Sequence, residues 1–228
     1  MILYPNAKIN LGLNIESKRS DGYHNISSVF YPIYDCFDIL EIVSSNSFLF
    51  TSSGISIPGS NNLCTKAYDL LKLKFNIPAV HIHLHKKIPI GAGLGGGSSD
   101  GAFVLKGLND LFKLNISNKT LKDLALELGA DCPFFIENEP KYITGIGDLM
   151  ENIKLDLSMY EIRLVDSKIH INTKNAYSNI VPKSQKLKLV DFGSADGQLL
   201  YQFNNQKKYK FRIEGVEPMK KLVQKAKK

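Results

Sequence analysis

A glycine-rich segment, residues 89–99, carries the strongest chemical signal in the sequence. It reads PIGAGLGGGSS, so five of its eleven residues are glycine, and it joins an alternating apolar segment to one with helical spacing. Glycine adopts backbone dihedrals that other residues avoid, so several N–H groups can converge on one anion. A helix that begins directly after such a loop adds the partial positive charge of its N-terminus. The segment therefore predicts a cradle for the phosphates of a nucleotide.

Other interpretations of this loop are weaker or incomplete. A Walker A loop needs a lysine directly before the serine, and no lysine stands there. A dinucleotide fingerprint fits Gly91, Gly93 and Gly96, but no acidic strand end follows about twenty residues later. A flexible connector remains the structural alternative. We expect Ser98 and Ser99 to cap the helix that follows.

The elements around the loop alternate between strand and helix patterns without a regular βαβ order. This mixture predicts an α+β fold, with a mixed sheet and helices, more than a doubly wound parallel sheet. A hairpin is expected with Gly145 and Gly147 at its turn. The expected strands lie within 2–19, 28–45, 47–59, 79–90, 130–138 and 141–153, and the expected helices are 62–75, 98–114 and 117–129.

Three histidines and three cysteines invite a metal or redox interpretation. His81, His83 and His85 share one face of a strand because their period is two, but no further ligand is recognisable, so a solvent-facing polar stripe is favoured. The three cysteines have no metal-type spacing and are expected to be small buried side chains: Cys36, Cys64 and Cys132. The odd number of thiols and the absence of a recognisable signal peptide or apolar membrane span predict a cytoplasmic protein.

The net charge of +7 is unevenly distributed. Residues 1–182 contain 17 Lys and Arg against 18 Asp and Glu, whereas residues 183–228 contain 12 against 4. The basic character therefore belongs to the tail, and the main body gives no electrostatic reason to expect a nucleic-acid partner.

Taken together, the motifs resemble the GHMP kinases. PIGAGLGGGSSDGA is similar to that family's phosphate loop, and two further motifs, NAKINLGLNIESKRSDGYHNISSVFYPI and LGADCPFFIENEPKYITGIGDLMENI, flank it in the family's order. The resemblance covers residues 1–182. It points to the branch of the family that phosphorylates a cytidine diphosphate sugar alcohol in isoprenoid precursor biosynthesis. It implies ATP and Mg²⁺ as cofactors and a small-molecule substrate, with no membrane partner.

The resemblance also implies roles for individual residues. Lys8 in AKIN and Asp131 in GADCPFF would be catalytic, with the carboxylate as general base and the ammonium offsetting the charge that develops. Tyr23 would stack on cytosine and His24 would bind its polar edge. The remaining substrate contacts would be Asn10 and Thr173. The nucleotide would bind at Pro89, Ile90, Gly91, Ala92, Gly93, Leu94, Gly95, Gly96, Gly97, Ser98, Ser99 and Asn62, with Ser99 also facing magnesium.

The tail departs from the kinase pattern. The family's later asparagine-acidic motif and its second glycine-serine loop are absent from the sequence. Instead, residues 183–228 resemble the first βαβ unit of an S-adenosylmethionine-dependent methyltransferase, with a Gly193 to Gly197 turn and Glu217 at a strand end. We expect a kinase N-terminal ATP-binding domain at 1–150, the start of the kinase C-terminal domain at 151–182 and a basic βαβ-like fragment at 183–228.

Two other functions stay open on the sequence. A kinase truncated and joined to a foreign fragment predicts a catalytically impaired nucleotide-binding remnant. A basic nucleic-acid-binding module rests only on the charge of the tail, where Lys207, Lys208, Lys210 and Arg212 accompany two aromatic residues.

Overall fold

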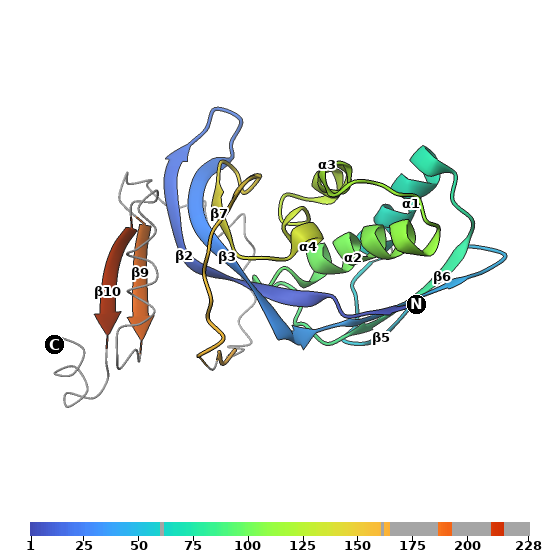
Figure 1. Cartoon of the computed structure of the whole chain (residues 1–228), viewed down its shortest axis with the longest axis horizontal. Helices are drawn as coiled ribbons and strands as arrows, with labels where there is room; N and C mark the ends of the chain where they lie inside the picture. Colours follow the sequence, from blue (N-terminus) through green and yellow to red (C-terminus); the bar gives the residue numbers. More distant parts are fainter. Residues whose placement is uncertain (60–61, 161, 165–186, 193–210, 217–228) are drawn as a thin grey trace. The chain divides into compact units, whose positions relative to one another are not determined.

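The structure is a computed structural model that describes residues 1–59, 62–160, 162–164, 187–192 and 211–216 (Figure 1). The chain divides into two compact units. Among the described residues, the first unit comprises 1–9 and 31–139. The second comprises 10–30, 140–164 and the two C-terminal strands.

The first unit contains a mixed four-stranded sheet in the order β1-β4-β6-β5. Strand β4 runs antiparallel to both β1 and β6, whereas β5 runs parallel to β6. The sheet is amphipathic because Val80, Ile82 and Leu84 of β6 are fully buried and alternate with the half-buried histidines. The strands span Ile2–Leu3 (β1), Ile39–Ser44 (β4), Leu49–Gly54 (β5) and Val80–Lys86 (β6).

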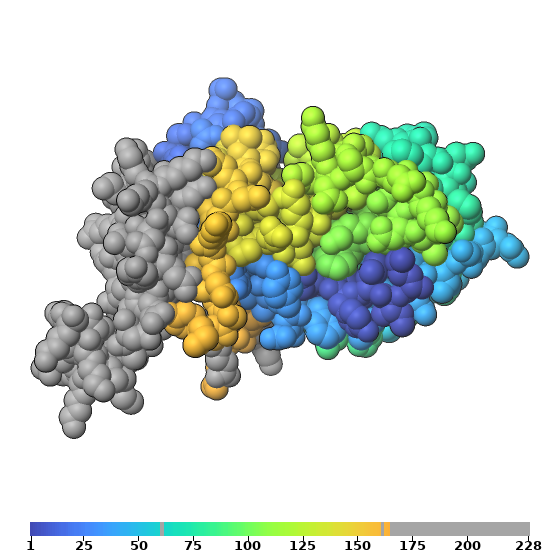
Figure 2. Space-filling view, viewed as in Figure 1, coloured from blue at the N-terminus to red at the C-terminus, as the bar shows by residue number. Residues whose placement is uncertain are grey.

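Four helices complete the first unit, and Figure 1 shows them on one side of this sheet. Helix α2 lies very close to the strands, since a Cβ on Gly107 would lie 2.6 Å from Leu3 Cδ1. In Figure 2 the green residues of α2 and α3 adjoin the dark blue N-terminal residues. None of the helices in the described ranges is long and apolar enough to cross a membrane. The helices span Leu63–Phe75 (α1), Gly96–Leu111 (α2), Asn118–Leu128 (α3) and Phe134–Glu137 (α4).

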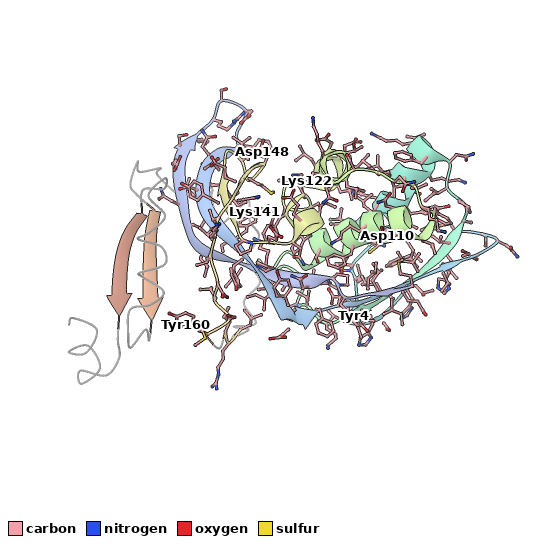
Figure 3. All side chains as sticks on the ribbon, viewed as in Figure 1. Tyr4, Asp110, Lys122, Lys141, Asp148 and Tyr160 are labelled. Atoms are coloured by element: carbon pink, nitrogen blue, oxygen red, sulfur yellow. The ribbon has the colours of Figure 1, made fainter. Side chains whose placement is uncertain are left out.

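A second sheet has the order β2-β3-β7-β8. It belongs to the second unit except for residues 6–9 of β2 and 31–37 of β3, which are part of the first. The expected hairpin is confirmed, since β7 and β8 pair antiparallel and Gly145 and Gly147 have positive φ values of 68° and 107°. Asp148, labelled in Figure 3, closes the turn by accepting the N–H of Ile146 at 3.0 Å. The strands span Asn6–Lys18 (β2), His24–Phe37 (β3), Lys141–Thr144 (β7) and Leu149–Asn152 (β8).

Two strands are described in the tail, β9 (Leu187–Phe192) and β10 (Phe211–Val216). They pair in parallel, with Leu187 opposite Phe211. The two strands expected from the sequence are therefore confirmed, and their parallel pairing fits a βαβ connection. The expected glycine turn, the helix between the strands and Glu217 lie outside the described residues.

Two local expectations are wrong. Helix α2 begins at Gly96, and its N-cap is Gly95 in the left-handed conformation without a side-chain cap, so Ser98 and Ser99 lie inside the helix. The segment 130–138 is a turn followed by α4 and contains no strand. Its backbone bonds are local, with Phe135 N–H donating to Cys132 O and Asn138 N–H to Phe134 O. The aromatic pair suggested a strand, but Pro133 at the helix start favours this turn.

Candidate functional site

The glycine loop adopts the backbone conformation that its sequence predicts. Gly91, Gly93 and Gly95 have φ values of 76°, 75° and 69°, a region that other residues rarely occupy. The loop connects β6 to α2, and its residues 90–93 are exposed. It therefore presents backbone N–H groups at the start of a sixteen-residue helix, where an anion is stabilised.

Strand β2 holds the end of this loop in place. Lys8 N–H donates to Leu94 O at 2.9 Å. A Cβ on Gly95 would lie 3.0 Å from both Lys8 Cγ and Phe135 Cζ, so only glycine fits without a shift of its neighbours. The lysine stem and the loop are consequently in direct contact.

The Lys8 ammonium meets the carboxylate that the sequence singled out. Lys8 Nζ lies 3.3 Å from Asp131 Oδ2, and the side chains are 6% and 34% exposed. The lysine side chain is thus buried, whereas the carboxylate that its ammonium group contacts remains accessible to solvent. The structure brings together Lys8, Asp131 and the glycine loop within the first unit.

A rigid support lies behind Asp131. Cys132 N–H donates to Gly129 O at 3.1 Å, and the Cys132 side chain is fully buried. Burial raises the pKa of the Cys132 thiol to about 11, although a hydrogen bond with the Ser98 side chain opposes this rise. The thiol is therefore neutral near pH 7 and has no nucleophilic role, as the sequence suggested.

An ion pair also fixes the short helix that follows Asp131. Lys122 of α3 is labelled in Figure 3, and its Nζ lies 2.7 Å from Glu137 Oε1 of α4. Phe134 and Phe135 are completely buried and pack edge to face, with ring centroids 5.0 Å apart. These contacts fix α4, and with it the turn that carries the carboxylate.

Ser99 and two glycines show where a ligand would fit. The Ser99 hydroxyl is buried and has no hydrogen-bond partner among the residues that the structure describes. Buried polar groups are normally paired, so an unpaired oxygen in the first turns of α2 suits a phosphate or a hard cation such as Mg²⁺. A Cβ on Gly93 or Gly97 would meet nothing within 4 Å, so the loop has open space at both positions.

A second lysine–aspartate set, which the sequence did not indicate, lies close to the loop at Gly96. Lys86 Nζ is 2.5 Å from Asp38 Oδ2 and 2.7 Å from Asp100 Oδ2, and all three residues are buried. One sequence signal could have found it, since Lys86 occupies the buried phase of the alternation in β6. Burial raises the pKa of Asp100 to about 7, with Lys86 opposing the rise and Asp38 adding to it.

The remaining predicted residues lie elsewhere. Asn62 is the N-cap of α1, where its side-chain oxygen accepts the N–H of Thr65 at 3.0 Å. Asn10, Tyr23 and His24 belong to the second unit, on or directly before its two long strands. Tyr23 is 61% exposed, so its ring is available to a ligand. Thr173 lies outside the described residues.

The histidine stripe is a hydrogen-bonded ladder. Thr51 Oγ1 lies 2.8 Å from His81 Nε2 and from His83 Nδ1, and Ser53 Oγ lies 3.0 Å from His83 Nε2 and 2.9 Å from His85 Nδ1. Throughout the described part of the chain, no three His, Cys, Asp or Glu side chains are grouped so as to hold a metal. The ladder is consistent with the polar stripe that the sequence favours.

A family model of the GHMP kinases N terminal domain matches residues 62–139. The match begins at the N-cap of α1, includes the whole glycine loop and ends just beyond α4. The match includes Asp131, Lys86, Asp100 and the glycine loop, whereas Lys8, Asp38 and the predicted substrate residues Asn10, Tyr23 and His24 lie outside it.

Curated relatives extend the likeness over most of the chain. A protein from Azobacteroides pseudotrichonymphae is 54% identical over 183 residues, which cover 79% of this chain and 68% of the relative. One from Cytophaga hutchinsonii is 50% identical over 194 residues, which cover 84% and 72%. Both carry the name 4-diphosphocytidyl-2-C-methyl-D-erythritol kinase.

Solved structures share the fold. A crystal structure of 4-(cytidine 5'-diphospho)-2C-methyl-D-erythritol kinase is 37% identical with a TM-score of 0.61, covering 68% of this chain and 56% of the solved one. The mevalonate kinase of Methanococcus jannaschii gives a TM-score of 0.53 at 17% identity, covering 68% and 56%, which supports the fold alone. The matched part of the chain thus spans little more than half of these solved proteins.

Proposed function

Because the chain belongs to the GHMP kinases, and within them to the 4-diphosphocytidyl-2-C-methyl-D-erythritol kinases, we propose that it phosphorylates 4-diphosphocytidyl-2-C-methyl-D-erythritol. The γ-phosphoryl group of ATP would pass to the 2-hydroxyl of that substrate, in non-mevalonate isoprenoid precursor biosynthesis. The observation that carries the proposal is the Lys8–Asp131 pair at 3.3 Å, with Lys8 in contact with the glycine loop.

The pair supplies the two functions that phosphoryl transfer needs. Asp131 is the general base, which accepts the proton of the substrate hydroxyl as the oxygen attacks phosphorus. Lys8 holds this carboxylate in place and offers a positive charge to the oxygens on which negative charge develops. Since the Lys8 side chain is only 6% exposed, its charge acts where water screens it little.

The loop supplies the nucleotide site. Its backbone N–H groups and the N-terminus of α2 face the polyphosphate, and the unpaired Ser99 hydroxyl is the side-chain ligand available to Mg²⁺ or to a phosphate oxygen. Bound Mg²⁺ would neutralise charge on the phosphates. Asn62 stays a candidate for contact with the adenine. Its side-chain oxygen caps α1, and the Nδ2 of the same amide would be the donor to the base.

Substrate recognition is proposed for the second unit. The exposed Tyr23 ring suits stacking on cytosine, which contributes roughly 1–3 kcal/mol. His24 would read the polar edge of the base, and Asn10 and Thr173 would contact the rest of the substrate. The division of the chain at residues 150 and 182 stays a proposal of the same kind.

The impaired remnant is the less favoured alternative. The relatives of about 50% identity are all named as the kinase, and the catalytic pair, the loop and their supports are present together. The tail supplies only two parallel strands among its described residues, which supports no separate activity.

The test is a coupled ADP-release assay with 4-diphosphocytidyl-2-C-methyl-D-erythritol, compared with mevalonate and homoserine. We expect ATP-dependent turnover of the cytidine substrate alone, and loss of that turnover in Asp131→Ala. Binding of ATP without turnover of any substrate would instead support the remnant.

A further inference from the structure

The buried Asp38–Lys86–Asp100 triad joins the two ends of the glycine loop. Asp38 Oδ2 accepts a hydrogen bond from Lys86 Nζ. Asp38 Oδ1 accepts hydrogen bonds from the backbone N–H groups of Lys87 at 2.5 Å and Ile88 at 2.8 Å. Residues 87 and 88 lead directly into the loop. Asp100, which accepts the same ammonium at 2.7 Å, lies in α2, just after the loop.

The loop also rests on the lysine. A Cβ on Gly96 would lie 2.9 Å from Lys86 Nζ and 2.9 Å from Ile88 Cγ2. The ammonium group lies next to the first residue of α2. It links the two ends of the loop, since it bonds both to Asp38, which holds residues 87 and 88, and to Asp100.

The charge of the triad is unbalanced when both carboxylates are ionised, since two negative groups then surround one positive group. The titratable groups that face Asp100 are Lys86 from β6, Asp38 between β3 and β4, and the Cys64 thiol from α1. Cys64 stays neutral because burial raises its pKa well above its ordinary value. The attraction of both carboxylates outweighs the effect of burial and raises the pKa of Lys86, so the lysine stays charged.

We propose that Lys86, Asp38 and Asp100 are positioning residues for nucleotide binding, which hold the ends of the glycine loop so that its N–H groups converge on the phosphates. This inference rests on the proposed kinase function only for the identity of the ligand, ATP. None of the three side chains reacts.

Two variants separate the loss of the hydrogen bonds that link the ends of the loop from the loss of charge balance in the triad. Lys86→Met leaves two buried carboxylates without their cation, whereas Lys86→Met/Asp100→Asn removes one charge of each sign and keeps Asp38 on its two backbone donors. Lys74→Met, which breaks an exposed pair with Glu127 in the same unit, is the matched control. Hydrogen exchange of a peptide covering residues 87–100 and titration with ATP and Mg²⁺ are measured for each protein.

We expect the double variant to exchange its loop amides about tenfold faster or more, and to bind ATP about tenfold more weakly, with the control unchanged. In turnover, the KM for ATP rises by the same factor while the KM for the cytidine substrate stays within about twofold. Asp100→Asn alone keeps a weaker acceptor for Lys86, so it should show the same two changes in the same direction and to a smaller extent. It serves as the decisive variant if the double variant does not fold.

The two proposals fail in different ways. Wild-type protein that binds no ATP would refute the kinase function, and the exchange measurement alone would then decide whether the triad holds the loop. Normal exchange and normal ATP affinity in the folded double variant, or in Asp100→Asn if the double variant does not fold, would overturn the positioning role while the kinase function stood.

Discussion

Two sets of lysine and aspartate side chains contact the same glycine loop, and their surroundings differ. In the Lys8–Asp131 pair the atoms are 3.3 Å apart, and the carboxylate is 34% exposed. In the Asp38–Lys86–Asp100 triad the distances are 2.5 and 2.7 Å, and all three side chains are at most 4% exposed. The carboxylate of the first set can be reached from solvent, and those of the second set cannot.

The difference separates chemistry from support. A base must be reached by the group that it deprotonates, so a long contact to an accessible carboxylate fits a working site. A buried charge needs close partners, because removing one partner leaves another charge without compensation in the interior. On this proposal the same residue types serve two purposes, and five predictions test the division.

The largest effect is expected for Lys8→Met. The methionine stem keeps the contact with Gly95 but removes the charge beside Asp131. We expect kcat to fall by about 10²–10³-fold, the range found when one electrostatic donor is removed from an active site. The melting temperature should change little. Steady-state kinetics and thermal unfolding of the same preparation check both parts, and a large loss of stability with normal kcat would reverse the assignment.

The triad should show the opposite behaviour. Asp38→Asn removes the negative charge that pairs with Lys86 and weakens the hydrogen bonds that the side chain accepts from two backbone N–H groups. We therefore expect a loss of roughly 3–5 kcal/mol in the free energy of unfolding. Lys74→Met, at a pair with exposed side chains, should lose only about 0–1 kcal/mol. Urea unfolding of both variants measures the contrast, and equal losses would contradict it.

Stability should depend on pH through Asp100. Burial raises its pKa from 3.8 to about 7, so the folded state holds this proton more tightly than the unfolded chain does. The contribution of this group to the free energy of unfolding therefore falls, by up to a few kcal/mol, as the pH rises from about 4 to about 7. Urea unfolding across that range checks the sign. In Asp100→Asn this part of the decline should disappear, and an identical profile would argue against the burial of an ionisable carboxyl.

The smallest effects concern two glycines of the loop. Gly95→Ala places a Cβ at φ 69° and 3.0 Å from Lys8 and Phe135, so we expect a loss of about 2 kcal/mol. Gly97→Ala, inside α2 with open space around its Cβ, should be neutral or gain about 0.5–1 kcal/mol. Thermal unfolding of the two variants compares their stabilities. If the open side of the loop holds phosphates, Gly97→Ala should nevertheless weaken ATP binding in the same sample.

The sequence predicts Lys8, Asp131 and the glycine loop better than it predicts the Asp38–Lys86–Asp100 triad. The glycine loop has a local signature, and Lys8 and Asp131 stand in short motifs that resemble a known family. The triad as a whole has no such signature. Asp100 stands in the loop motif PIGAGLGGGSSDGA, but Lys86 and Asp38 lie outside it and are 48 residues apart. The other local trace is a lysine in the buried phase of an apolar strand. The start of α2 differs from the expected one for a local reason. Gly95, in the left-handed conformation, precedes the helix, which begins before the serines that usually cap one.

The division between chemistry and support is tested most directly by Asp131→Asn. The measurement is kcat at saturating ATP and cytidine substrate, in wild-type and variant proteins with matched ATP affinity and melting temperature. The account predicts turnover by the wild type and a fall of at least about 10²-fold in the variant, since the amide cannot accept the hydroxyl proton. Equal rates in the two folded proteins would show that the exposed carboxylate beside Lys8 is not the base.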